Sequence, residues 1–182
     1  MKVKNIIDED FTNYKKPSMF IGTSECNFKC DKECGKPVCQ NSELAKAPTI
    51  EIDDDEIIQR YLNNPITEAI TIGGLEPFDT FEELYQFIKN FRRKSNDDII
   101  IYTGYYPEEI SEKIRQLSLF LNIIIKFGRF IPNQKSHYDT VLGIELASDN
   151  QEAIRMEDLM WKNFILMKNY LILHIRRKIS II

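Results

Sequence analysis

Short runs of β-branched and other apolar residues alternate along the chain with stretches in which apolar residues recur at helical spacing. The runs predict four strands, over residues 18–21, 68–72, 98–102 and 122–127. The stretches between them predict helices over residues 53–62, 80–91 and 107–120. Because the strand runs do not alternate with polar residues, both faces of each strand are expected to be buried, as in a parallel sheet covered by helices. The pattern therefore predicts a single α/β domain with a mostly parallel sheet.

The two ends of the chain carry weaker signals. Residues 1–16 mix acidic and basic side chains, which predicts a loose lead-in. A loop and a weak strand are expected over residues 131–146, and a helix is expected to begin near Gln151. Periodicity does not settle whether the tail, residues 156–182, is helix or strand. We therefore expect one domain over residues 17–155.

Composition and charge narrow the class of protein. A chain of 182 residues, 43% hydrophobic, can bury one substantial core. Its net charge of −4, with both signs interspersed, offers no basic surface for nucleic acid. No run of about 18 uncharged apolar residues is present. The first ten residues contain no apolar signal segment, so the expected location is the cytoplasm, with no membrane partner.

All four cysteines, Cys26, Cys30, Cys34 and Cys39, follow the first predicted strand within one loop. Such a cluster could form disulfides, a zinc site or an iron–sulfur site. Disulfides are least expected in a reducing compartment, and zinc usually takes two close cysteine pairs separated by a long span. Closely spaced cysteines on an irregular loop are typical of iron–sulfur ligation, so this interpretation fits best.

The cysteine loop resembles the radical S-adenosylmethionine enzymes, and within them the activating proteins of anaerobic ribonucleotide reductase. Cys26 and Cys30 have the spacing of the first two cysteines of that family, and Cys39 is followed by a matching Gln-Asn-Ser-Glu-Leu segment. The family has two residues between its second and third cysteines, whereas eight residues, 31–38, stand in this chain. The resemblance implies Cys26, Cys30 and Cys39 as the metal ligands, with Cys34 as the alternative third ligand.

Other family motifs fall in loops that follow the predicted strands, at the carboxyl edge of the sheet where ligand sites of such folds lie. Their order matches the family over most of the chain, although Phe127 stands where the family has Asp and Val38 where several members have an aromatic residue. The resemblance implies cofactor-binding roles for Asn41, Gly73, Gly74, Glu76, Pro77, Thr103, Gly104, Tyr105, Arg129, Ser148 and Asn150.

The resemblance also implies a fold and an activity. The fold would be a partial (βα) barrel, and the cofactors a 4Fe-4S cluster and S-adenosyl-L-methionine. The activity would be cleavage of that compound to place a glycyl radical on the large subunit of anaerobic ribonucleotide reductase, with a flavodoxin- or ferredoxin-type electron donor. Two alternatives stay open: a radical enzyme acting on a small molecule, as carboxy-deazaguanine synthases do, and a non-catalytic zinc-binding module.

Overall fold

The computed structural model of the protein describes residues 1–159. Of the expected tail it describes only a helical turn over residues 156–159, and the remainder of that tail lies outside the described residues.

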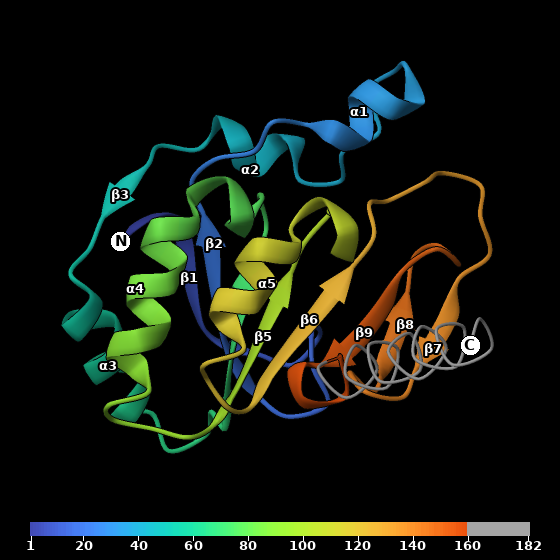
Figure 1. The fold of residues 1–182 in the computed structure, drawn as a ribbon. Coiled ribbons are helices and arrows are strands. Elements are labelled where there is room, and N and C mark those ends of the chain that lie inside the picture. The colour runs from blue at the N-terminus through green and yellow to red at the C-terminus, as the bar shows by residue number, and fades with distance from the viewer. Residues whose placement is uncertain (160–182) are drawn as a thin grey trace, which may run out of the picture.

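A seven-stranded sheet of order β3-β1-β2-β4-β5-β6-β9 runs through the molecule (Figure 1). Its strands are β1 (Lys2–Asp10), β2 (Ser18–Thr23), β3 (Ile50–Glu51), β4 (Ala69–Gly73), β5 (Asp98–Tyr102), β6 (Ile123–Phe127) and β9 (Glu152–Arg155). The four predicted strands, β2, β4, β5 and β6, are parallel neighbours, and β1, β3 and β9 are antiparallel additions. The α/β class with a mostly parallel sheet is therefore confirmed. Between residues 1 and 159 no strand pairing joins the edges β3 and β9, so no closed barrel forms.

Three helices cover one face of this sheet (Figure 1). They are α3 (Asp54–Leu62), α4 (Phe81–Phe91) and α5 (Ser111–Leu117). The Asp53 carboxylate caps α3 by accepting the Asp55 N–H. The apolar stripe of α4 is buried in a core that includes Ile70 and Ile101 from the sheet. These contacts show why the helical spacing in the sequence was informative.

The predicted helix over residues 107–120 is divided. A 3₁₀ turn, η2 (Pro107–Glu109), precedes α5, and Ile110 between them has a non-helical backbone with φ of −130° and ψ of 25°. A similar turn, η1 (Pro77–Thr80), precedes α4. Both turns begin at a proline, which is suited to the first position of a helical turn because it has no N–H to satisfy.

Within residues 1–159, the opposite face of the sheet is covered by loops and a hairpin. Ala69, Ile100 and Ile124 pack there against Tyr14, Leu142 and Leu146 in a second core cluster. Leu146 belongs to a hairpin of β7 (His137–Asp139) and β8 (Ile144–Leu146). The hairpin and loops that pack on this face leave space for a pocket at the carboxyl ends of its strands.

Two expectations about the chain ends are wrong. Residues 1–16 are not loose, because β1 pairs with β2 and buries Val3 completely. The helix expected near Gln151 is instead β9, which pairs antiparallel to β6. The Gln151 side chain accepts the N–H groups of Ala147 and Ser148 and closes a turn there, so the following residues leave in an extended direction. Pairing with a neighbouring strand therefore determines the conformation of both segments.

Candidate functional site

A pocket of about 430 Å³ lies at the carboxyl ends of the parallel strands, on the sheet face opposite α3, α4 and α5. Figure 1 shows the cysteine loop, with α1 (Lys29–Cys34) and α2 (Ser42–Lys46), above these strand ends. Three of the four cysteines line the pocket: Cys26, Cys30 and Cys39. Cys34 is not among the lining residues.

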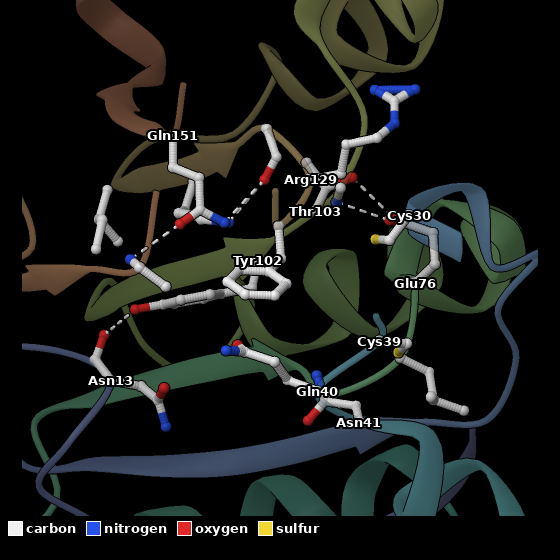
Figure 2. Close-up of a pocket in the computed structure, with 18 of the residues that line it drawn as sticks. Asn13, Cys30, Cys39, Gln40, Asn41, Glu76, Tyr102, Thr103, Arg129 and Gln151 are labelled. Atoms are coloured by element: carbon white, nitrogen blue, oxygen red, sulfur yellow. Dashed lines mark hydrogen bonds between the residues drawn. The ribbon is translucent and has the colours of Figure 1, made fainter. Parts of the chain in front are cut away.

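The pocket brings together much of the predicted site (Figure 2). Besides the three cysteines, the predicted residues that line it are Asn41, Gly74, Glu76, Thr103, Gly104 and Arg129. The predicted residues outside its lining are Gly73, Pro77, Tyr105, Ser148 and Asn150. Part of the predicted set therefore shares one pocket with the three cysteines, and the roles of all these residues stay a prediction.

Asp31 explains how the eight-residue insertion returns to the pocket. Its Oδ1 accepts the N–H groups of Val38 and Cys39, both at 2.8 Å, and Asp31 itself is one residue after Cys30. The insertion is thereby closed into a loop whose two ends lie together. In Figure 2 Cys30 and Cys39 lie at the same side of the pocket. Cys34 is closer to Cys30 in the sequence. The hydrogen bonds of Asp31 nevertheless place Cys39, and not Cys34, at the pocket with Cys30.

The thiols are held in a partly desolvated environment. Burial raises the pKa of Cys26 to about 12, despite the Phe28 N–H that it accepts at 3.3 Å. Burial also raises the pKa of Cys30. Both thiols are therefore protonated at neutral pH until a metal displaces the proton.

Single-ion coordination is a poor fit to this donor set. Within residues 1–159, no group of three or more His, Cys, Asp or Glu side chains is placed to hold a metal ion. Three thiols that line one pocket are the donor set that an iron–sulfur cluster takes, because each iron binds its own thiolate.

Gly74 allows the loop after β4 to approach the cysteine loop closely. It has a φ of +78°, which favours glycine, and a Cβ at this position would stand 2.6 Å from Leu44 Cδ2 and 3.4 Å from Gly22 Cα. Two residues after Gly74, the Glu76 N–H donates a hydrogen bond to Glu25 O of the cysteine loop, at 2.8 Å. The loops after β2 and β4 are therefore joined at the rim of the pocket.

Glu76 is a buried carboxylate that accepts hydrogen bonds from three neighbouring groups. Its Oε1 accepts from Thr103 Oγ1 at 2.7 Å and from the Phe78 N–H at 3.1 Å, and its Oε2 accepts from the Gly104 N–H at 2.9 Å. Burial nevertheless raises its pKa to about 7, and the nearby Asp79 charge adds to the rise. Thr103 and Gly104 thus serve in the structure as supports that orient Glu76 at the pocket wall.

Tyr105 holds the cysteine loop from outside the pocket. Its hydroxyl donates to Asp79 Oδ1 at 2.6 Å, and it accepts from Asn27 Nδ2 at 2.6 Å. Asp79 also accepts the Asn27 N–H at 2.7 Å. This cluster fixes the residue directly after Cys26 to the turn before α4.

Arg129 is almost completely buried, and it connects the strand ends to α1. Its guanidinium lies 2.8 Å from Glu109 and 3.0 Å from Glu33, and it stacks over the Tyr106 ring at 4.6 Å. Lys29 of α1 donates to Glu109 at 2.7 Å. Burial acts to raise the pKa of Glu109, but the hydrogen bond from Lys29, together with the positive charge of Arg129, leaves it lowered. Arg129 Nε is buried without a partner among residues 1–159.

Ser148 and Asn150 form a layer behind Arg129. Asn150 Nδ2 donates to Arg129 O at 2.9 Å and to the Tyr106 hydroxyl at 3.0 Å. Ser148 is fully buried, and its Oγ accepts the Ile131 N–H. These residues stabilise the loop after β6 rather than line the pocket.

Comparison with known proteins decides the family. The sequence model described as "4Fe-4S single cluster domain" matches residues 17–154, which is most of the chain. The chain belongs to this family. Searches of curated proteins and of solved structures each returned no match. The expectation of an iron–sulfur protein with a 4Fe-4S cluster is confirmed at this level.

The pocket of this 4Fe-4S single cluster domain fits the group that the family implies. Cys26, Cys30 and Cys39 are its three sulfur donors, and their assignment as the ligands stays a prediction. None of the helices in residues 1–159 is long and apolar enough to cross a membrane.

Lys126 is among the pocket residues that the motif comparison did not identify. Lys126 lines the pocket from within β6 and is only 7% exposed. The signal was present in the sequence, because a lysine interrupts the otherwise apolar run Ile123–Phe127.

Proposed function

We propose that the protein is a radical S-adenosylmethionine activase that generates a glycyl radical on a partner enzyme. The partner that we propose is the large subunit of anaerobic ribonucleoside-triphosphate reductase, with a flavodoxin- or ferredoxin-type protein as electron donor. The location is the cytoplasm. The single observation that carries the proposal is the pocket itself. It joins three cysteines of one loop to the Gly74–Glu76 and Thr103–Gly104 segments, which resemble motifs of that family in the same order.

The proposal gives each part of the pocket a task. Cys26, Cys30 and Cys39 would hold three irons of the cluster and leave one iron without a protein ligand. When bound, the reduced cluster would supply the single electron for cleavage of a C–S bond of the sulfonium, which would yield methionine and transfer a hydrogen atom from the partner's glycine to the 5′-deoxyadenosyl group.

The chain's own residues would bind and orient the cofactor. Glu76 retains an open lone pair on Oε2 after accepting three hydrogen bonds, so it can accept from the ammonium of the methionyl group. Gly74 lets the backbone of the same loop approach the ligand. The cysteine loop, fixed by Asn27, Asp79 and Tyr105, would hold the cluster at one side of the pocket.

The fold supports the same proposal. Four parallel strands with helices on one outer face, and a pocket at their carboxyl ends on the other face, are compatible with the partial (βα) barrel of radical S-adenosylmethionine enzymes. The described domain is small, which suits an open rim that receives a segment of a partner protein.

The test is reductive cleavage of S-adenosylmethionine by anaerobically reconstituted protein, with and without the reductase. We expect 5′-deoxyadenosine and methionine in equal amounts, and a glycyl radical signal in electron paramagnetic resonance when the reductase is present. The matched control is Cys30→Ala, which should abolish both products. The absence of 5′-deoxyadenosine under both conditions would overturn the proposal. Cleavage of S-adenosylmethionine without a radical on the reductase would indicate that the protein acts on a different substrate.

A further inference from the structure

Lys126 is a buried cation of β6 that the proposed function leaves without a task. Its side chain is 7% exposed and lines the pocket together with Cys30. Its partners across the sheet are Tyr102 on β5 and Ala153 on β9, so it occupies a position inside the sheet and not at an edge. An apolar side chain would satisfy packing at such a position, so the charge calls for an explanation.

The charge of Lys126 is not compensated by a carboxylate. Its Nζ donates to Gly128 O at 2.8 Å, and within residues 1–159 no carboxylate oxygen lies within 4.0 Å of it. Arg129 also lines the pocket, but its guanidinium lies 2.8 Å from Glu109 and 3.0 Å from Glu33. A buried charge is costly unless it is paired. Lys126 therefore contributes a positive charge to the pocket wall that its protein neighbours leave unbalanced.

The loop after β6 contacts both the Lys126 ammonium and Cys30. Gly128 O, which accepts from Lys126, also accepts from Gln151 Nε2 at 3.2 Å, so the position of the ammonium is fixed. Two residues further along the chain, the Phe130 backbone N–H interacts with the Cys30 sulfur: burial raises the pKa of Cys30, and this N–H acts against the rise. One short loop therefore positions the cation and the sulfur relative to each other.

The charges of Lys126 and Cys30 act on each other across the pocket. Burial lowers the pKa of Lys126 to about 8, while the negative charge of a Cys30 thiolate and then that of Glu76 act to raise it. A group with this pKa is mostly protonated at pH 7. Because a Coulomb interaction is mutual, the ammonium stabilises negative charge at Cys30 as much as the thiolate stabilises the ammonium.

We propose that Lys126 raises the reduction potential of the 4Fe-4S cluster held at Cys30. Reduction adds one electron to the cluster, so the charge at the site becomes one unit more negative. A fixed cation beside a cluster ligand stabilises the reduced form more than the oxidised form, and net charge is one of the factors that set the potentials of such clusters. The proposal rests on the family's cluster with Cys30 as a ligand, and not on the activase reaction.

The experiment is an anaerobic redox titration of the reconstituted protein at pH 7, without S-adenosylmethionine. Dithionite supplies the electrons, and electron paramagnetic resonance measures the reduced cluster. Two unit charges about 10 Å apart, at an effective dielectric constant of about 20, change an equilibrium constant by about tenfold. In Lys126→Met we therefore expect the ratio of reduced to oxidised cluster to be about tenfold lower than in the wild type at the same solution potential. This corresponds to a midpoint potential that is lower by about 59 mV.

Two further variants separate the effect of the charge from that of packing. Lys126→Gln keeps an N–H donor for Gly128 O but carries no charge, so its midpoint should fall as far as that of Lys126→Met. Lys126→Arg keeps the charge, so its midpoint should stay close to the wild-type value. Only chains that hold a cluster contribute to the midpoint, so incomplete reconstitution of a variant does not change the result.

Lys113→Met is the matched control. Lys113 also donates to a backbone carbonyl, Phe78 O at 2.6 Å, but it lies outside the pocket lining. Its removal takes the same charge from the protein, and the midpoint should equal that of the wild type.

The outcomes separate the role of Lys126 from the proposed function. A wild-type midpoint in Lys126→Gln would overturn the proposal, whatever Lys126→Met shows. Equal shifts in all three Lys126 variants would overturn it as well, because packing and not charge would then determine the potential. If the neutral variants shift the midpoint but the wild type cleaves no S-adenosylmethionine, the proposed function falls and the role of Lys126 stands. If the wild type takes up no redox-active cluster, both fall.

Discussion

Removal of the Glu109 carboxylate should destabilise the protein through Arg129. In Glu109→Gln the Arg129 guanidinium, whose side chain is only 1% exposed, loses its contact at 2.8 Å with a carboxylate. Breaking a buried ion pair by neutralising one partner costs about 3–5 kcal/mol, since the other charge stays buried. Glu33 still contacts Arg129 at 3.0 Å, and Glu109 is partly exposed, so we expect a smaller loss of about 2 kcal/mol.

The assay is thermal unfolding of the anaerobic protein at neutral pH. For a chain of this length, a loss of about 2 kcal/mol corresponds to a decrease in Tm of about 4–8 °C. Lys29 loses its carboxylate partner in the same variant, so the cysteine loop should be held less firmly. We therefore also expect less iron per chain after reconstitution.

Glu112→Gln is the matched control for this prediction. Glu112 lies three residues after Glu109 and pairs with Arg115, but both side chains of that pair are well exposed. Exposed ion pairs contribute little, so the Tm and iron content of this variant should equal those of the wild type. If Glu109→Gln unfolds at the same temperature as Glu112→Gln, Arg129 does not depend on Glu109, and our interpretation of this network is refuted.

Two further predictions concern the pocket itself. Alanine in place of Cys26, Cys30 or Cys39 should abolish the visible absorbance and the content of about four irons, whereas Cys34→Ala should keep both. Loss of the cluster in Cys34→Ala with retention in Cys39→Ala would contradict the ligand set. The pKa of Glu76 is raised from 4.5 to about 7, so its contribution to stability is fully present below pH 4.5 and is lost as the pH rises through about 7. Denaturant unfolding across this range should show the wild type losing up to about 3 kcal/mol relative to Glu76→Gln, and parallel pH profiles of the two proteins would show that Glu76 is not buried as a neutral acid.

The sequence was most informative where local rules decide the structure. The uninterrupted Ile-rich runs of β5 and β6 predicted their place at the centre of a parallel sheet, because only strands covered on both faces have that composition. The stripe of α4 predicted its buried side for a similar reason. The close spacing of Cys26 and Cys30 indicated an iron–sulfur site, because the thiolates that hold such a cluster commonly come from one short loop.

The edge strands could not be assigned in the same way. In β1 polar and apolar residues are mixed, and the segment becomes a strand only because β2 offers it a hydrogen-bonding edge. In β9 the residues Glu152–Arg155 have no strong strand composition, and pairing with β6 fixes their conformation. Strand pairing between distant segments is a tertiary interaction, so propensity alone gave the wrong result at both positions.

The sequence by itself determined the parallel α/β core and the chemistry of the cysteine loop, since both depend on residue type and local spacing. Only the tertiary structure decided which side chains meet. Asp31 closes the insertion and returns Cys39 to the pocket, while Cys34 stays outside its lining. Lys126 is buried in β6 at the pocket wall, where its ammonium donates to Gly128 O and has no carboxylate partner within residues 1–159. The physical reason is that desolvation and hydrogen-bond partners depend on what surrounds a group in three dimensions, and neither can be read from its neighbours along the chain.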